Sequence, residues 1–545
     1  MEPISAEELA SLIVDESKLA ASPHLELRQD ACEQLYELCQ RYRERAESAI
    51  PALIDRLQDS DPKIQDHVAG GLRCCGQAAV RPLVDRLSDS NPVVRRNAAA
   101  ALVTYQELDH QRSLKQIAGP LAKVLHDSNA EVRAAATAAL GCTGDTSEAT
   151  LEGLAGLIRS STPSDRAAGL RAVGEIHDRS KSTAALGRFR ADAIRLLGDK
   201  DANVRWAAVI ALECCGLAPA ELVSLLAAAL GDPSFNVRGT SLVTLAGLAR
   251  EHVDCSAAVP QLIRLISTDE REYNRGLARE LLGEIGPAAK AAIPALQEQL
   301  NSSNESTMLE AVEALWKIDR RVDESLAAIE RQLKRRSSHQ EKLCDTLVPL
   351  GRHAAPLKKY IIEFLNKDGD WDVQWAAADT LGAIAPDDPD VIAALIACLG
   401  HKSGIVCSGC SRSLSKAGLK AVGPLIEQLQ TGDAHRCEWA ADALGRIGPA
   451  AHAAVGPLEK LLTSNERGVR AWSAIALGKI NGSPAAVPVL IKALEQSDEQ
   501  EQAALALAKI GPAAKAAEPA LRRLLTTGGA ASRAAAKQAL EAISR

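Results

Sequence analysis

The stretch EIGPAAKAAIPALQEQL occupies residues 284–300, and close copies of it read RIGPAAHAAVGPLEKLL at 446–462 and KIGPAAKAAEPALRRLL at 509–525. A second recurring phrase reads NPVVRRNAAAALVTY at 91–105, NAEVRAAATAALGCTG at 129–144 and DANVRWAAVIALECCG at 201–216. The phrases return about every 31 to 38 residues, a period typical of stacked helix pairs. The repeat therefore predicts an all-α superhelix in which each helix pair packs only on its neighbours.

One unit shows how the residues set the two helices. Leu53, Ile54 and Leu57 fall on one face of the first helix. Asp61 is placed to cap the second helix, and Pro62 fits its first turn, where a missing N–H costs little. Glycines that precede proline suit the chain reversal into the next unit and stand at 286, 448 and 511.

The repeat phrases divide the chain into a short N-terminal part and a long array. Residues 1–45 carry two helical patterns without the phrases and are interpreted as an N-terminal helical cap, which covers the first face of a solenoid. Residues 46–545 read as about fifteen helix pairs. The spacing is irregular near 180–200, 322–356 and 388–418, where we expect longer helices or loops.

Composition narrows the function classes. The 545 residues are 46% hydrophobic but only 3% aromatic, so the core is expected to consist of Ala, Leu, Ile and Val. The formal net charge is −7, and no basic stripe follows the repeats, so no nucleic-acid partner is expected. The densest basic runs, Lys334–Arg336 and Arg320–Arg321, are interpreted as solvated loops and helix ends.

Several features favour a cytoplasmic protein. The N-terminus, MEPISAEELASLIVDES, is acidic and does not resemble a signal peptide. We find no apolar run near 18 residues, so no membrane span is expected. The thirteen cysteines are scattered, and such free cysteines behave as small buried hydrophobic residues in a reducing compartment.

An arginine recurs near the start of the second helix, seven residues before its main Leu or Val. The positions are 95, 133, 166, 205, 238, 275, 470 and 533. A cation there opposes the helix dipole by about 0.3–1 kcal/mol, so something should compensate. Aspartates recur two residues after the last Leu of the first helix, at 59, 89, 127, 199 and 232.

We therefore expect a structural ladder in which each arginine meets a turn carboxylate of its own or an adjacent unit. Its expected members are Arg95, Arg133, Arg205, Arg238, Arg470, Asp89, Asp127, Asp199 and Asp232. The functional alternative is a row of arginines that binds an anionic ligand.

Six tryptophans are conspicuous in a chain so poor in aromatic residues. Trp206 and Trp375 follow the arginine position directly, which turns them away from the core stripe. Trp439 and Trp472 lie one residue later, and Trp371 lies near the start of a second helix. These five are candidate partner-binding residues, because tryptophan is enriched at binding hot spots. The alternative is that they fill space between helices where the neighbouring side chains are small.

A CxxC pair, Cys407 and Cys410, is the main candidate for metal or redox chemistry, with Cys398 before it and Cys437 after it. Such chemistry needs a low-pKa thiolate or four convergent ligands. However, Cys407 and Cys437 fall at the arginine position, and Cys410 falls at a recurrent small-residue position. The repeat register therefore explains much of the motif, and we predict no catalytic residue and no metal ligand.

The phrases resemble HEAT repeats, and most closely the short bacterial variety named after the phycobilisome lyase subunits. The shared pattern, D-x-x-x-x-V-R-x-x-A-x-x-x-L-G, extends over about 46–545. The resemblance implies an α-α superhelix of the HEAT/armadillo type. It says little about function, because many functions share this fold.

The family that the phrases resemble includes two enzymatic branches. Deoxyhypusine hydroxylase binds a di-iron centre through His-Glu dipeptides, and none of the eleven histidines here precedes a glutamate. The bilin lyases act on a chromophore bound to a partner protein, and no residue set of theirs can be carried over to this chain.

We therefore expect a non-catalytic scaffold or adaptor without cofactor. It would bind a protein or extended peptide on the concave face, which second helices line in HEAT-like solenoids. The alternative is a bilin lyase-like enzyme, or enzyme subunit, acting on a protein-bound chromophore.

Overall fold

The computed structural model describes residues 6–103, 111–320, 322–334, 340–367, 369–496 and 499–545. These residues form α-helices and short 3-10 helices, and no strand occurs among them. The predicted all-α fold is confirmed. By its internal contacts the chain divides into two compact units, Met1–Ala295 and Leu296–Arg545.

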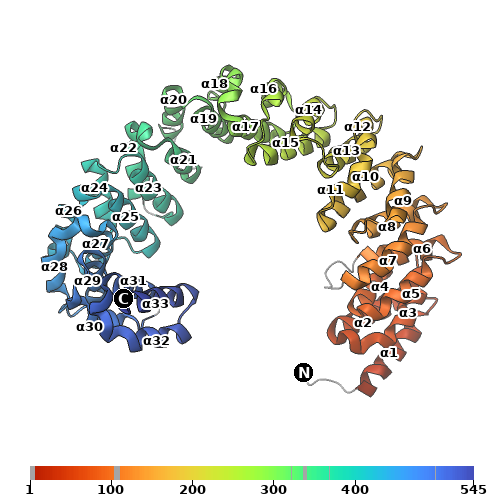
Figure 1. The fold of residues 1–545 in the computed structure, drawn as a ribbon, viewed down its shortest axis with the longest axis horizontal. Coiled ribbons are helices and arrows are strands. Elements are labelled where there is room, and N and C mark those ends of the chain that lie inside the picture. The colour runs from red at the N-terminus through yellow and green to blue at the C-terminus, as the bar shows by residue number, and fades with distance from the viewer. Residues whose placement is uncertain (1–5, 104–110, 321, 335–339, 368, 497–498) are drawn as a thin grey trace. The chain divides into compact units, whose positions relative to one another are not determined.

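The first unit is a stack of helix pairs in two layers (Figure 1). Second helices contact one another from pair to pair along the stack. The first-helix layer comprises α1 (Ala6–Ala20), α3 (Ile50–Asp55), α5 (Gln77–Arg86), α7 (Gln111–Val124), α9 (Glu148–Ile158), α11 (Thr183–Leu186) with α12 (Arg190–Leu196), α14 (Pro219–Ala229) and α16 (Val259–Thr268). The second-helix layer comprises α2 (Leu25–Tyr42), α4 (Pro62–Cys74), α6 (Pro92–Val103), α8 (Ala130–Gly141), α10 (Pro163–Ser180), α13 (Ala202–Cys214), α15 (Phe235–Arg250) and α17 (Glu272–Ile285).

The second unit repeats this arrangement, and α18 (Ile293–Gln299) spans the boundary between the units. Its first helices are α20 (Asp323–Lys334), α22 (Lys358–Asn366), α24 (Pro389–Cys398), α26 (Leu419–Thr431), α28 (Val455–Leu461), α30 (Val487–Ala493) and α32 (Glu518–Thr527). Its second helices are α19 (Glu305–Asp319), α21 (Gln340–Leu347), α23 (Trp371–Ile384), α25 (Gly404–Ala417), α27 (Ala434–Ile447), α29 (Arg467–Asn481), α31 (Gln500–Ile510) and α33 (Ala530–Ile543). The described helices from α3/α4 to α32/α33 make the fifteen predicted pairs.

Side-chain caps fix where the second helices begin. Asp61 accepts hydrogen bonds from the N–H groups of Lys63 and Ile64, as the sequence predicts. Asn129 caps α8 and Asp201 caps α13 in the same way. Each cap satisfies N–H groups that have no partner within the helix.

The Gly-Pro phrase folds as a turn followed by a 3-10 helix. Gly286 has a φ of 65°, a left-handed conformation that glycine adopts without strain. Residues Gly286–Ala292 form the 3-10 helix η6, in which the Ile293 N–H donates to Lys290. Pro294 has no N–H with which to continue α-helical pairing to that carbonyl. The copies at η8 (Gly448–Ala454) and η10 (Gly511–Ala517) begin with glycine φ values of 72° and 68°.

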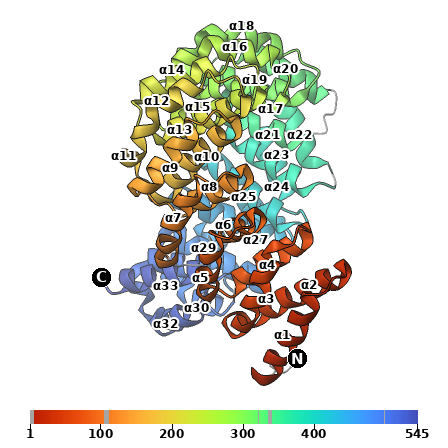
Figure 2. The same cartoon turned by 90° about the vertical axis from the view of Figure 1, so that its right-hand side faces the viewer.

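The stretches with irregular spacing differ from one another. In 180–200 the first helix is broken into α11, a short 3-10 helix and α12. In 322–356 the 3-10 helix η7 (Val348–Leu357) follows α21, and residues 335–339 lie outside the described part. The stretch 388–418 holds the helix pair α24 and α25. At the N-terminal end, α1 and α2 stack beside α3 and α4 (Figure 2), and their role as a cap stays a prediction.

Candidate protein-binding surface

The recurrent arginine reaches from one repeat to the turn of the next. Arg95 of α6 donates from Nε to Asp127 Oδ2 at 2.7 Å and from Nη2 to Asp127 Oδ1 at 2.9 Å. Its Nη1 donates to the carbonyls of Asp89 and Ser90, in the turn that precedes its own helix. One guanidinium thus joins two successive turns with a two-point contact to the carboxylate.

The same contact recurs along the first unit, always with the following repeat. The ion pairs are Arg28–Asp59, Arg95–Asp127, Arg133–Asp165, Arg166–Asp199, Arg205–Asp232 and Arg238–Asp269. We call these six pairs the ladder. Arg28, Asp165 and Asp269 were not predicted from the sequence. Arg28 and Asp269 stand at the usual ladder positions counted from the N-cap of the second helix, four residues after His24 and two before Arg271, whereas Asp165 lies inside α10 and has no such signal.

Asp89 lies outside the ladder, although the sequence placed it there. It pairs with Arg86 at 3.3 Å, because Gln65 occupies the arginine position of the preceding repeat. Gln65 donates to the carbonyl of Asp59 in the preceding turn.

Each ladder group is partnered and largely buried. The side chains of Arg95 and Asp127 are 15% and 10% exposed. The hydrogen bond from Arg95 lowers the pKa of the Asp127 carboxyl, and the same bond raises the pKa of Arg95. This geometry supports the structural interpretation over an arginine row open to an anionic ligand.

In the second unit the arginine position is held by other residues in some repeats, and where an arginine is kept, as at Arg470, its contacts differ. Gln374 donates to the carbonyls of Leu365 and Lys367, at the end of the preceding helix. Arg470 donates to the carbonyls of Ser464 and Asn465. Among the described residues, none of the ion pairs of the second unit joins Arg470 to a carboxylate. Arg470 therefore binds the carbonyls of its own turn but not a carboxylate of the next repeat.

Cys407 and Cys437 also replace the ladder arginine. The Cys407 thiol lies 3.2 Å from the carbonyl of His401 and 3.5 Å from that of Leu399. Burial raises the pKa of Cys407 to about 11. The hydrogen bond with Cys398, followed by burial, raises the pKa of Cys410. Both thiols are therefore protonated at neutral pH, which opposes a redox reading of the CxxC pair.

A metal site at the CxxC pair finds no support either. Within the described ranges, no group of three or more His, Cys, Asp or Glu side chains is arranged to hold a metal ion.

We expect Cys407 to react slowly with thiol reagents. Burial raises the pKa of both thiols, but Cys407 is fully buried whereas Cys74 is half-buried, so with iodoacetamide at pH 8 native Cys407 should be alkylated at least about tenfold more slowly than Cys74. Mass spectrometry of the alkylated peptides measures both rates, and denatured protein provides the reference in which both react. Equal rates in the native protein would contradict a buried, protonated Cys407.

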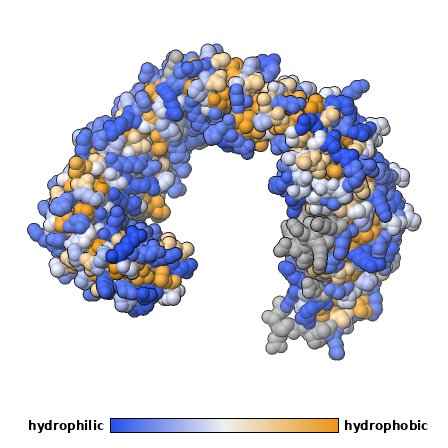
Figure 3. All heavy atoms as spheres, viewed as in Figure 1, coloured by the Kyte–Doolittle hydropathy of each residue, from blue (hydrophilic) through white to orange (hydrophobic). Residues whose placement is uncertain are grey.

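The surface offers no broad apolar patch on the face in view, where hydrophobic residues form small groups between hydrophilic ones (Figure 3). The residues considered for partner binding are therefore the individual tryptophans. Trp206 is half-buried, and its Nε1 donates to Thr240 Oγ1 at 2.9 Å. This bond links α13 to α15, so Trp206 contributes to packing between repeats.

Four of the candidate tryptophans lie on α23, α27 and α29 of the second unit. Trp371 is 49% exposed, and Trp375 follows one helical turn later. The Trp375 ring lies under the Arg412 guanidinium, 5.4 Å from ring centroid to Cζ. A Cβ at Gly409 would lie 3.0 Å from this ring, so the glycine lets α25 approach the indole closely.

The other two tryptophans form a stacked pair. The ring centroids of Trp439 and Trp472 are 6.3 Å apart with an interplanar angle of 24°. His435 lies edge-on to Trp439, with centroids 6.4 Å apart. All three lie near the N-terminal ends of second helices. Trp371, Trp375, Trp439 and Trp472 are together called the aromatic surface below.

The basic runs are only partly described. Arg321, Arg335 and Arg336 lie outside the described residues. Lys334 pairs with Glu330 at 3.2 Å, and the Arg320 guanidinium lies 4.6 Å from the centroid of the Trp316 ring.

A family described as HEAT repeats matches the sequence over residues 16–102, 50–120, 80–174, 191–283, 359–445 and 422–508. Together these segments cover more than half of the chain. The chain belongs to the HEAT-repeat proteins. No curated protein matches this HEAT-repeat chain.

Solved structures of similar fold include importin beta, a Kap95:Nup1 complex and a complex of the karyopherin Kap121p. Importin beta aligns with 98% of this HEAT-repeat chain and 88% of its own, at 13% identity and a TM-score of 0.58. A Kap95:Nup1 complex aligns with 99% and 82%, at 14% identity and a TM-score of 0.54. The karyopherin Kap121p, bound to the extreme C-terminus of the protein phosphatase Cdc14p, aligns with 99% and 68%, at 12% identity and a TM-score of 0.50. At these identities the likeness shows the fold alone.

Among the helices of the described residues, none is both long enough and apolar enough to cross a membrane.

Proposed function

We propose that this HEAT-repeat protein is a non-catalytic scaffold or adaptor that binds a protein or an extended peptide on its second-helix layer, at the aromatic surface. The observation that carries the proposal is the stacked Trp439–Trp472 pair, which a chain with so few aromatic residues places beside His435 on adjacent second helices. Large aromatic side chains of this kind anchor protein interfaces.

The comparisons support a binding role by analogy of fold. Kap121p is described as bound to the extreme C-terminus of Cdc14p, and Kap95 as part of a complex with Nup1. Second helices line the concave face in solenoids of this type, which suits an extended chain. The analogy extends to the class of ligand, a protein segment, and not to its identity.

We further propose that the protein acts in the cytoplasm without nucleic acid, and that its repeats are of the short phycobilisome-lyase type. All thirteen cysteines are free, as expected in a reducing compartment. The repeat type rests on the quoted phrases alone. Within the described residues, no cluster of side chains favours the alternative of a bilin lyase-like enzyme that acts on a protein-bound chromophore.

The proposal is tested by photo-crosslinking in native cell extract. A benzoylphenylalanine at Trp371 should form partner adducts, whereas one at Leu419, a 71% exposed residue of the first-helix layer, should not. Adding Trp439→Leu and Trp472→Leu to the first protein should lower adduct yield at least about tenfold, the loss expected on removing hot-spot residues. Circular dichroism should show equal helicity. Adducts that form equally at both sites, or that persist in the double variant, would contradict binding at the aromatic surface.

A further inference from the structure

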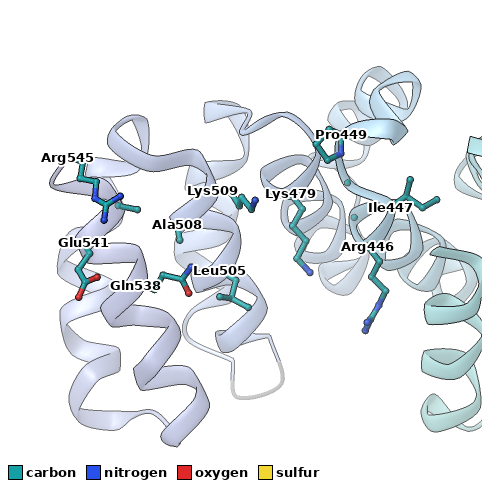
Figure 4. Close-up of a pocket in the computed structure, with 13 residues that line it drawn as sticks. Arg446, Ile447, Pro449, Lys479, Leu505, Ala508, Lys509, Gln538, Glu541 and Arg545 are labelled. Atoms are coloured by element: carbon teal, nitrogen blue, oxygen red, sulfur yellow. The ribbon is translucent and has the colours of Figure 1, made fainter. Parts of the chain in front are cut away.

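A pocket of about 720 Å³ opens between the C-terminal parts of α27, α29, α31 and α33. Figure 4 shows its lining side chains on these neighbouring helices. Its volume lies within the range of sites that enclose small ligands or a few side chains.

The charges in the pocket are unevenly balanced. Arg446, Lys479, Lys509 and Arg545 line the pocket with four cations, against one lining carboxylate, that of Glu541. Arg446 is in addition paired at 2.7 Å with the buried Asp442 behind the lining, so Lys479, Lys509 and Arg545 carry the excess positive charge. Lys479 Nζ donates to the neutral amide oxygen Gln502 Oε1 at 2.7 Å, and the carboxylates of Asp442 and Glu501 stabilise its charge only through space. Burial lowers the pKa of Lys479 and outweighs the opposing effect of these two carboxylates. An anion placed beside Lys479 would therefore stabilise its charged form.

The pocket continues the aromatic surface. Arg446 follows Trp439 by seven residues on α27, and Lys479 follows Trp472 by seven residues on α29. Seven residues are about two helical turns, or roughly 10 Å, so each cation lies on the same helix face as its tryptophan. Two adjacent helices thus present an aromatic side chain and, two turns further on, a cation.

The walls of the pocket favour a peptide over a free anion. Leu505, Ala508 and Ala542 give apolar surface between the charged groups. A small inorganic anion would leave that surface uncovered. A nucleic-acid strand needs a stripe of cations that follows its backbone, whereas these cations converge on one pocket of a chain with a net charge of −7.

We propose that this pocket binds an acidic segment of the partner protein, one that carries glutamate or aspartate next to an aliphatic side chain. This inference rests on the proposed function and specifies the chemistry of its partner. Lys479 and Lys509 pair with the carboxylates, and the aliphatic side chain packs on Leu505 and Ala508.

Fluorescence anisotropy with the full chain tests the pocket directly. The probe is a fluorescein-labelled, amide-capped peptide of three Glu-Glu-Leu repeats, and its control is the matching Gln-Gln-Leu peptide. Lys479→Gln/Lys509→Gln should weaken binding of the acidic peptide at least tenfold. Lys492→Gln/Arg523→Gln removes the same charge from exposed positions of the first-helix layer and should change binding less than twofold. The glutamine peptide should bind at least tenfold more weakly than the acidic one.

Three results would overturn the proposal: equal weakening by both double variants, equal affinity for both peptides, or no binding of the acidic peptide. Tighter binding of a ten-residue oligothymidylate, lost in the Lys479→Gln/Lys509→Gln variant, would overturn it in favour of nucleic acid. The crosslinks at Trp371 separate the two proposals. If the acidic peptide fails while those crosslinks persist, only the pocket assignment is wrong; if the peptide binds and the crosslinks fail, the aromatic surface is wrong.

Discussion

Replacing Asp269 with alanine should lower the free energy of unfolding of the repeats around α15 and α17 by about 3–5 kcal/mol, the cost of breaking a buried ion pair. Arg238 Nε lies 2.6 Å from Asp269 Oδ2, and the two side chains are 9% and 0% exposed. The remaining guanidinium would keep the turn carbonyls of Asp232 and Pro233 and a 3.4 Å contact with Glu270. It would lose its buried counter-charge.

Hydrogen exchange is the appropriate measurement, because a repeat array opens locally as well as globally. Amides of α15 and α17 should lose protection in the Asp269→Ala protein, and amides of α29 should change little. Glu518→Ala provides the control: it breaks an exposed pair with Arg522 within one helix, which is worth less than about 0.5 kcal/mol. Similar losses in the two variants would show that burial adds nothing to the ladder.

The effect of Asp269→Ala should depend on pH. Burial tends to raise the pKa of Asp269, but hydrogen bonds from Arg238, the Arg271 N–H and Asn274 outweigh it and hold the pKa below its ordinary value. A lowered folded pKa means that the stabilisation is fully present above the unfolded pKa, near 3.9, and is lost as the pH falls through the folded value. The difference between wild type and variant should therefore be full at pH 7 and shrink in acid below about pH 4.

The repeat phrases were enough to predict the fold because each unit carries its own local signals. Asp61 caps its helix where the sequence placed it, Asn129 and Asp201 do the same in later units, and the Gly-Pro steps reverse the chain. These signals depend on residues a few positions apart. Such signals can therefore be recognised in a single unit, and their recurrence in many units makes the fold prediction reliable.

Contacts between units were harder to foresee. The sequence pointed to Arg205 and to Asp232 but left open whether an arginine meets its own turn or the next one. The structure pairs it with the next, because the guanidinium already binds the carbonyls of its own turn. Asp165 was not predicted because Ser160 stands at the turn position that an aspartate holds in other repeats. The carboxylate that binds Arg133 comes instead from Asp165, within the first turn of α10.

The tryptophans show the same limit. Trp206 and Trp375 occupy the same register, so sequence reasoning treated them alike. Thr240 on the next repeat binds the Trp206 indole, whereas Gly409 and Arg412 frame Trp375. In both cases the surroundings of the indole are set by residues of the next repeat. The sequence of one repeat does not contain those residues. The four-cation pocket was missed for this reason, since its lining comes from four second helices and the Gly448-Pro449 turn.

The second large effect concerns a glycine of the repeat phrase. Gly382→Ala should destabilise the packing of α23 on α25 by about 1–3 kcal/mol, the usual cost of overfilling a core. A Cβ at Gly382 would lie 2.5 Å from both Cβ and Oγ of Ser413 and 2.9 Å from its Cα. Ser413 is fully buried, so relief requires a shift of the α25 backbone and not of a side chain alone.

Gly247→Ala is the matched control, because the same substitution there should have the opposite sign. Gly247 lies within α15, and a Cβ at this position meets nothing within 4 Å. Alanine should therefore stabilise α15 by about 0.5–1 kcal/mol through its higher helix propensity. Hydrogen exchange in α23, α25 and α15 measures both effects. If Gly382→Ala also stabilised its helix, the glycine of the Leu-Gly phrase would not be needed for close approach of second helices, and the spacing that forms the aromatic surface would need another cause.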